Sequence, residues 1–289
     1  MKQKKKTAED WVLDIIVYTT LLFMAMVMLV PFLNVIAKAF SADWAVNSGS
    51  VSLWPKEFQL DSIQYVVTDK AFLNSFAISV FVTFAGTVCN MLMTVLAAYP
   101  LSKRHLPGMK FFTLIFVFTM LFSGGMIPNY LLMKKLNLLN NLAVLIVPTL
   151  ITVYNMLLVK NYFESLPESV EESAMIDGAG KMTILFKIVL PMSTPMLATV
   201  ALFYAVSHWN NYMTPLIYIS KQSLKPLQLY LQEVILEAES TAMNGDAVNV
   251  AGENIRSATI VASVLPILVV YPFLQKYFVK GILVGSVKG

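Results

Sequence analysis

The stretch ESAMIDGAGKMTILFKIVLP, residues 172–191, is the most informative part of the sequence. Three residues separate Ala174 from Gly178, nine residues separate Gly178 from Ile188, and Leu190-Pro191 closes the stretch. This segment is charged and broken by glycines, but apolar runs long enough to cross a bilayer lie on either side of it. A membrane protein gains little from such a segment unless another molecule docks there. The pattern therefore predicts a docking surface between two spans.

The composition indicates a membrane protein. Of 289 residues, 57% are hydrophobic and only 13% are charged, with a mean hydropathy of +0.68, whereas soluble domains carry about 25% charged residues. Several apolar runs approach or exceed the roughly 18–20 residues that span the hydrocarbon core. These runs are Val12–Phe40, Phe72–Leu101, Phe111–Leu132, Leu142–Val159, Leu190–Ile219 and Ser257–Phe278. The sequence thus predicts an all-α membrane protein with six transmembrane helices.

The Lys and Arg residues between these runs predict the orientation. If residues 1–11 are cytoplasmic, thirteen Lys and Arg residues fall in inside segments and seven in outside segments. Positive charge concentrates on the cytoplasmic side of membrane proteins, so both termini are expected to be cytoplasmic. The net charge of +4 then reflects topology rather than nucleic-acid binding. Membrane lipid is the expected surrounding.

Three regions follow from this reading. Residues 1–71 comprise an N-terminal cytoplasmic segment, the first helix and an extracellular loop. Residues 72–278 form a core domain of five helices that includes the segment 165–190, and residues 279–289 form a cytoplasmic tail. No inverted repeat is visible, which weakens the case for a secondary transporter built from two related halves.

The segment 165–190 reads as two short helices. Ser165 and Glu168 suggest a capping box at the first helix start, and Gly178 suggests its end. A second helical stretch, Lys181–Leu190, leads into the fifth run. Glycines near Lys181 resemble a phosphate-binding loop, but Met175 and Met182 occupy the positions that need Gly and Ser or Thr. The chain is therefore not expected to hydrolyse ATP.

The first of these helices has one apolar and one acidic side. Leu166, Val170 and Ala174 recur on one face, while the polar faces carry glutamates and Asp177. A helix lying on lipid would be expected to carry Lys and Arg instead, because anionic headgroups repel carboxylates. A protein partner with a groove is the better fit.

Away from their ends, the apolar runs contain no Asp, Glu, Lys or Arg, and His208 is the one ionisable side chain of this type there. We expect His208 to be a neutral packing residue. Proton- and ion-coupled carriers need more such groups, so the energy should come from another subunit. The fifth run also carries amides and aromatics that suit a carbohydrate path: Trp209, Asn210, Asn211 and Tyr212. Bonding between helices is the alternative role for the two amides, and it is the expected role of Asn90 and Asn155.

With these residues in hand, the chain resembles the carbohydrate-uptake branch of type I ABC importer permeases, of the kind of the maltose transporter's second permease. The resemblance rests on the spacing in 172–191, which matches the cytoplasmic EAA loop with Ser173 in place of an alanine. It also rests on Trp209-Asn210 with Pro215-Leu216, and on the ending GILVGSVKG at 281–289. The stretch LFSGGMIPNYLLMKKLNLLNN at 121–141 is similar to a Gram-positive subgroup for larger oligosaccharides.

The resemblance implies partners and roles. The partners would be a second related permease, two ATPase subunits that bind ATP and Mg, and an extracellular sugar-binding lipoprotein, in a bacterial cell membrane. The chain itself would be no enzyme and hold no cofactor or metal. A loop with Met243, Asn244, Gly245 and Asp246 would face the lipoprotein, and Lys288 could touch the ATPase. The residues implied to contact the ATPase are Glu172, Ser173, Ala174, Asp177, Gly178, Ile188, Leu190 and Pro191.

Two other functions stay open at this point. One is an ABC permease for a non-sugar solute, against which the lack of buried charge and the Trp209-Asn210 pair argue modestly. The other is a secondary carrier or membrane enzyme, which would need ionisable or nucleophilic residues at depth. The sequence does not name the sugar.

Overall fold

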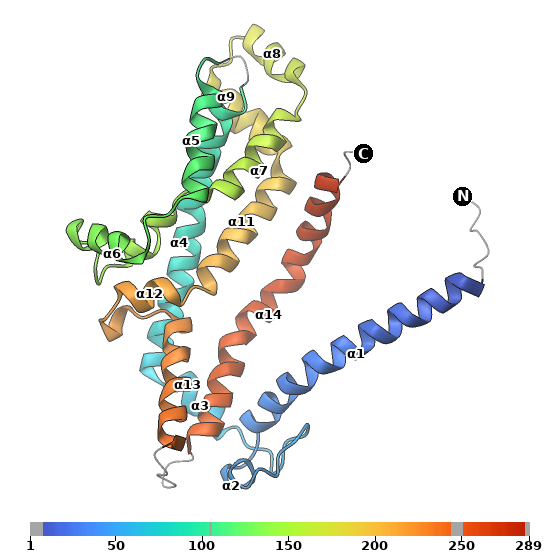
Figure 1. Cartoon of the computed structure of the whole chain (residues 1–289), viewed down its shortest axis with the longest axis vertical. Helices are drawn as coiled ribbons and strands as arrows, with labels where there is room; N and C mark the ends of the chain where they lie inside the picture. The colour runs from blue at the N-terminus through green and yellow to red at the C-terminus, as the bar shows by residue number, and fades with distance from the viewer. Residues whose placement is uncertain (1–7, 104–105, 244–250, 287–289) are drawn as a thin grey trace. The chain divides into compact units, whose positions relative to one another are not determined.

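The computed structural model describes residues 8–103, 106–243 and 251–286. All regular elements in these ranges are helices, which confirms the all-α class (Figure 1). The chain divides into two compact units: Met1–Asp69 with Glu233–Leu265, and Lys70–Gln232 with Pro266–Gly289.

The first unit is built on α1 (Ala8–Ala39), an apolar helix with acidic residues in its first turn and Lys38 in its last. The loop that follows contains two short helices, α2 (Asp43–Asn47) and α3 (Asp61–Thr68). A small core forms where this loop folds back on the end of α1. Its members are Ala37, Ala45, Val46 and Val51.

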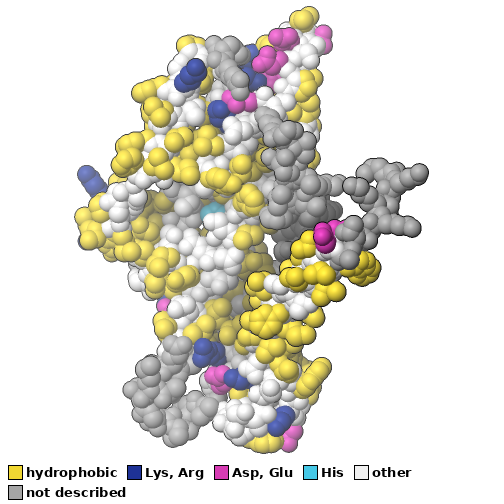
Figure 2. Space-filling view, turned by 45° about the vertical axis from the view of Figure 1, so that its right-hand side comes forward, with side chains coloured by type: hydrophobic (Ala, Val, Ile, Leu, Met, Phe, Trp, Pro, Cys, Tyr) yellow, Lys and Arg dark blue, Asp and Glu magenta, His cyan; other side chains and the backbone are white. Residues whose placement is uncertain are grey.

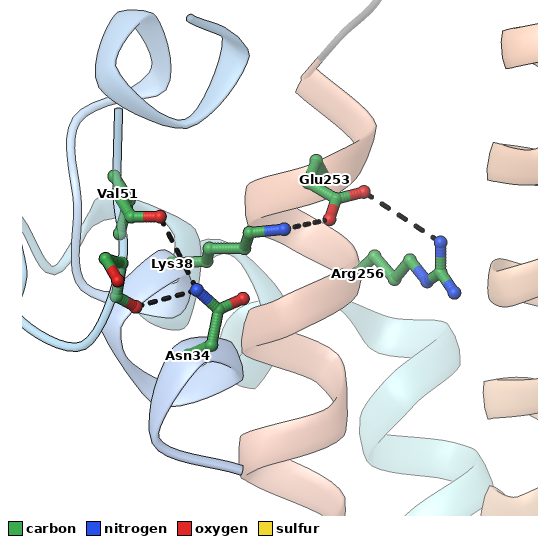
Figure 3. Close-up of polar contacts among 6 residues, drawn as sticks. Asn34, Lys38, Val51, Glu253 and Arg256 are labelled. Carbon is green, nitrogen blue, oxygen red and sulfur yellow. Dashed lines mark hydrogen bonds and ion pairs between the residues drawn. The ribbon is translucent and has the colours of Figure 1, made fainter. Parts of the chain in front are cut away.

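Polar contacts tie this loop and α14 (Ala251–Ser286) to the end of α1 (Figure 3). Asn34 Nδ2 donates to the carbonyl oxygens of Val51, at 3.4 Å, and Ser52, at 2.7 Å. Lys38 Nζ pairs with Glu253 Oε1 at 2.8 Å. Lys38 and Glu253 are only partly exposed, so the charges stabilise a fixed arrangement of the two helices within this unit.

The second unit is organised around α4 (Lys70–Leu101). Three helices pack along it: α5 (Met109–Leu121), α7 (Val153–Glu164) and α11 (Thr194–Trp209) (Figure 1). Burial of apolar side chains between them supplies the packing that holds the unit together. The most deeply buried members of this core are Ala98, Met156, Val159, Ile184, Leu185 and Val200.

Shorter elements complete the second unit. They are α6 (Met126–Lys135), the 3-10 turns Leu142–Leu145, Val147–Thr149 and Gln222–Leu224, α8 (Glu168–Ile176), α9 (Lys181–Ile184), the π turn Leu185–Val189, α10 (Leu190–Met192) and α12 (Met213–Tyr218). One further helix, α13 (Leu227–Met243), begins in this unit and runs into the first.

Breaks interrupt several of the predicted spans. Within the described residues, α1 and α4 alone are continuous helices long and apolar enough to cross a membrane, and the number rises to five if each bent pair is one span. The bends measure 111° between α5 and α6, 47° between the 3-10 turns and α7, and 85° between Lys181–Met192 and α11. The predicted count of six is therefore not established by the helices themselves.

The third and fifth runs are corrected by these breaks. Phe111–Leu132 was expected to be one helix, but α5 ends at Leu121 and the chain turns at Gly125, whose φ is +88°. The 13 residues of α5 cover about 20 Å, which is less than the thickness of the hydrocarbon core. In the fifth run α11 ends at Trp209, so the amides that follow lie at a break and not inside a continuous span.

Polar side chains of α4 bond to neighbouring segments of the second unit. Ser79 Oγ accepts from Leu227 N at 2.8 Å, at the start of α13. Thr94 Oγ1 lies 2.7 Å from the hydroxyl of Tyr204, which accepts from Thr152 N just before α7. In an apolar surrounding an unbonded backbone group is costly, so the bond from Ser79 stabilises the start of α13.

Candidate functional site

The predicted coupling segment forms α8 and α9 with a turn between them. Its predicted capping box is wrong, because Ser165 Oγ donates to Tyr162 O at 2.7 Å and so closes α7. Pro167 stands at the N-cap of α8, without a side-chain cap hydrogen bond. Glu168 and Glu171 lie in the first turn, where the helix dipole favours carboxylates.

α8 ends at Ile176, and Gly178 follows its C-cap residue Asp177, in keeping with the predicted helix stop. Gly178 has a φ of +82°, which glycine adopts without the steric cost of a Cβ. Gly178 N donates to Met175 O at 3.1 Å and Ala179 N donates to Ala174 O at 2.9 Å. This pair of hydrogen bonds is a Schellman motif, and it fixes a sharp turn toward α9.

The two sides of α8 are used differently. Leu166, Ala174 and Ala179 pack against the core of the second unit, and Val170 is half-buried, so the apolar face is confirmed. Exposed polar residues of α8 and its C-cap were predicted to face a partner. These are Glu172, Ser173 and Asp177.

Ile176 is a surface residue that the sequence reasoning missed. Its side chain is 86% exposed, and Met175 beside it is 40% exposed. Two positions beyond Ala174, Ile176 lies about 200° away around the helix, outside the apolar repeat. That departure from the repeat was the signal available in the sequence. An apolar knob next to Asp177 at the end of α8 suits a partner's groove.

The predicted second helix, Lys181–Leu190, contains a π turn at Leu185–Val189. Such turns are rare and often occur at functional sites. Ile188 is half-buried, Leu190 packs against the core and Pro191 is exposed. Three of the predicted coupling residues are half-buried and position the segment: Ala174, Ile188 and Leu190. The others are exposed: Glu172, Ser173, Asp177, Gly178 and Pro191.

Glu171 joins α8 to the end of α4, a contact that a single sequence does not predict because the partners are 68 positions apart. Its Oε1 forms an ion pair with Lys103 Nζ, and its Oε2 accepts from Tyr99 Oη at 3.3 Å. Lys103 Nζ also lies 4.8 Å from the centre of the Tyr99 ring. The Glu171 and Lys103 side chains are 14% and 20% exposed.

A hollow of about 180 Å³ lies beside this contact. It is lined by carboxylates of Glu164, Glu168, Glu171 and Glu172, together with Lys103, Ser102, Phe163, Leu166 and Met175. Figure 2 shows carboxylates gathered at the α8 end of the unit, with hydrophobic side chains along the flank below. Among the described residues, Lys103 pairs with Glu171 and Lys160 pairs with Glu164. Glu168 and Glu172 are the other acidic side chains in the described lining of the hollow.

The predicted substrate-path residues lie around the end of α11. Trp209 contacts Phe76 edge-on, with ring centres 6.2 Å apart, and lines an apolar hollow of about 320 Å³. Asn210 Nδ2 donates to Val206 O in its own helix at 3.0 Å. Asn211 donates to Thr214 Oγ1 at 3.0 Å and accepts from Thr214 N at 3.1 Å, which caps α12. These amide bonds are local, and Tyr212 is 40% exposed.

Asn90 forms hydrogen bonds between helices, as predicted, and His208 is one of its partners. His208 Nε2 lies 3.1 Å from Asn90 Oδ1, and Asn90 Nδ2 donates to Thr149 O. Gly86 permits this approach, because a Cβ there would lie 2.5 Å from His208 Nε2. The imidazole thus packs between α4 and α11 as a structural group.

Two predicted contact sites fall outside what the structure describes. Asn244, Gly245, Asp246 and Lys288 are among the residues not described, and Met243 ends α13 without a described side chain. Their roles toward the lipoprotein and the ATPase stay predictions.

Comparison with known proteins identifies relatives over the whole chain. The family model of binding-protein-dependent transport system inner membrane components matches residues 106–284. The polygalacturonan/rhamnogalacturonan transport system permease protein YtcP of Bacillus subtilis is 43% identical over 282 residues, 96% of this chain and 98% of that protein. Protein LplC of the same organism is 44% identical over 264 residues, 90% of each chain.

A solved structure agrees. One chain of a bacterial ABC transporter involved in the import of the acidic polysaccharide alginate superposes with a TM-score of 0.88 at 34% identity, over 96% of this chain and all of that one. Sequence family, relatives and fold therefore agree. The matched range includes α8, the turn at Gly178 and α9 (residues 168–184), which together are called the α8 elbow. This chain belongs to the family of binding-protein-dependent transport system inner membrane components.

Proposed function

We propose that this chain is the permease subunit of an ATP-driven, binding-protein-dependent importer of oligosaccharides. The α8 elbow carries the proposal: its apolar face packs into the unit while Glu172, Asp177 and Ile176 stay accessible. A segment held rigidly by a Schellman turn can transmit force, since its own packing resists deformation. In this proposal the ATPase binds α8, and ATP-driven closure moves the helices behind it.

The proposed assembly contains this chain, a second related permease, two ATPase subunits that hold ATP and Mg, and an extracellular sugar-binding lipoprotein. Family membership supports the binding protein, as the family's description names it. The proposed topology has six spans, with α14 as the sixth and both termini in the cytoplasm of a Gram-positive bacterium. The two Bacillus relatives support that origin.

We infer that the substrate is an acidic oligosaccharide. One relative is a polygalacturonan/rhamnogalacturonan permease and the structural relative comes from an importer of an acidic polysaccharide. Trp209 offers an apolar ring for a sugar face, and Asn210, which is exposed, offers an amide for hydroxyls. A permease for a non-sugar solute is less consistent with these relatives.

Reconstitution in proteoliposomes tests the proposal. The chain is assembled with its partner permease, ATPase and lipoprotein, and uptake is measured for galacturonate oligosaccharides and for neutral oligosaccharides of the same length. We expect uptake of the acidic set that needs both ATP and lipoprotein. Uptake without the ATPase would refute the coupling role, and uptake of the neutral set alone would refute the acidic substrate.

A further inference from the structure

Among the described residues, Glu171 is the side chain of α8 that bonds to the end of α4, through the Lys103 and Tyr99 contacts. Met175 Sδ accepts from Lys181 Nζ at 2.9 Å, a contact to α9 within the α8 elbow. Ser173 bonds within α8, to Ser169 O at 2.8 Å. The remaining attachments are apolar, through Leu166 and Ala174.

The polar attachment differs from the apolar ones in what it constrains. Apolar contacts are non-directional and tolerate sliding, whereas a charged hydrogen bond holds its atoms in a set direction. Tyr99 makes the arrangement more rigid, because its hydroxyl donates to Glu171 and its ring lies under Lys103 Nζ. Partial burial of Glu171 and Lys103 reduces screening by water and salt.

The attachment reaches the helix that organises the second unit. Lys103 and Tyr99 belong to the last turn of α4 and the residue pair after it, and Lys103 N donates to Pro100 O at 3.1 Å. α4 packs along α7 and α11, and it bonds to Thr149 O before α7 through Asn90 and to the Tyr204 hydroxyl of α11 through Thr94. A displacement of α8 that is passed to α4 therefore reaches the neighbouring spans.

We propose that Glu171 is a positioning residue that, with Lys103 and Tyr99, transmits the movement of α8 to α4 without contacting the ATPase itself. This rests on the proposed function of α8. Glu172, next in sequence, is exposed and in this proposal contacts the ATPase, whereas Glu171 contacts α4.

The test uses the complete complex with its ATPase and lipoprotein, with galacturonate oligosaccharides as the probe. Glu171→Gln and Lys103→Gln each remove one charge, and Lys103→Glu with Glu171→Lys restores the pair in reverse. Lys160→Gln is the matched control, since Lys160 pairs with Glu164 inside α7 at 2.6 Å, with both side chains 13% exposed. Three quantities are measured: co-purification with the ATPase, ATP hydrolysis, and solute transported per ATP.

We expect both single variants to co-purify normally and hydrolyse ATP, with transport per ATP reduced about tenfold, the fold-change that loss of one charged hydrogen bond produces. The reversed pair should recover at least half of the loss, and Lys160→Gln should match the wild type. Normal transport per ATP in both single variants, or loss that follows co-purification without recovery in the reversed pair, would overturn the inference. A wild-type complex without ATP-dependent uptake would instead refute the proposed function.

Discussion

α8 and the break between α11 and α12 are both polar segments beside apolar helices, but they use their polar side chains in opposite ways. At the break, Asn210 bonds to Val206 O and Asn211 bonds to Thr214. On α8, Glu172 and Asp177 face solvent. Groups near hydrocarbon must find partners within the chain, whereas groups in water can stay accessible to another protein. Polar residues in a membrane protein therefore indicate a partner surface most clearly where they lie outside the apolar region.

The largest expected effect lies on the α8 side of this comparison. Ile176→Glu places a charge where an apolar, 86% exposed side chain is proposed to enter the ATPase groove. Burying an unpaired charge costs several kcal/mol, so uptake and co-purification with the ATPase should fall about 100-fold or more. The chain itself should insert and fold normally, because Ile176 packs against little of it.

Ile176→Leu is the control, and it should retain most of the uptake because it keeps the apolar volume. Normal co-purification of the Ile176→Glu variant would show that the exposed end of α8 does not dock on the ATPase, and the contrast with the α11 break would then lose its functional meaning.

A smaller effect is expected at the turn that ends α8. Gly178 and Gly180 both have open space where a Cβ would be added, but φ is +82° at Gly178 and −71° at Gly180. An alanine in the left-handed conformation costs roughly 1–2 kcal/mol. Gly178→Ala should therefore lower uptake several-fold at normal membrane abundance, while Gly180→Ala should not. Equal uptake by the two variants would show that the turn geometry is irrelevant to coupling.

The sequence predicted the elbow better than the spans, for a physical reason. Gly178 marks a left-handed turn and Leu166 and Ala174 mark a packed face, and both signals are local. The break at Trp209 and the turn at Gly125 both lie within apolar runs. Hydropathy counts apolar residues along the chain and does not register such breaks. The Glu171–Lys103 pair joins distant positions, and one sequence carries no sign of it.

The smallest expected effects separate bonding from path-lining at the break. Asn211 caps α12 through Thr214, so Asn211→Ala should lower the stability of the purified chain by about 1 kcal/mol, the usual cost of losing a cap. Asn210 is exposed, and within the described part of the chain its side chain bonds to the preceding turn of its own helix, so Asn210→Ala should leave the melting temperature almost unchanged.

Uptake of galacturonate oligosaccharides by the two variants then carries the test. If the break lines the path, Asn210→Ala should slow uptake about two- to fivefold without loss of assembly. A hydrogen bond to a sugar hydroxyl contributes about 0.5–1.5 kcal/mol, and we expect part of that free energy to affect the rate of uptake. Unchanged uptake by Asn210→Ala, with a loss in Asn211→Ala that follows its stability, would assign the break to structure alone. The acidic elbow would then be the one polar segment of this pair with a direct part in transport.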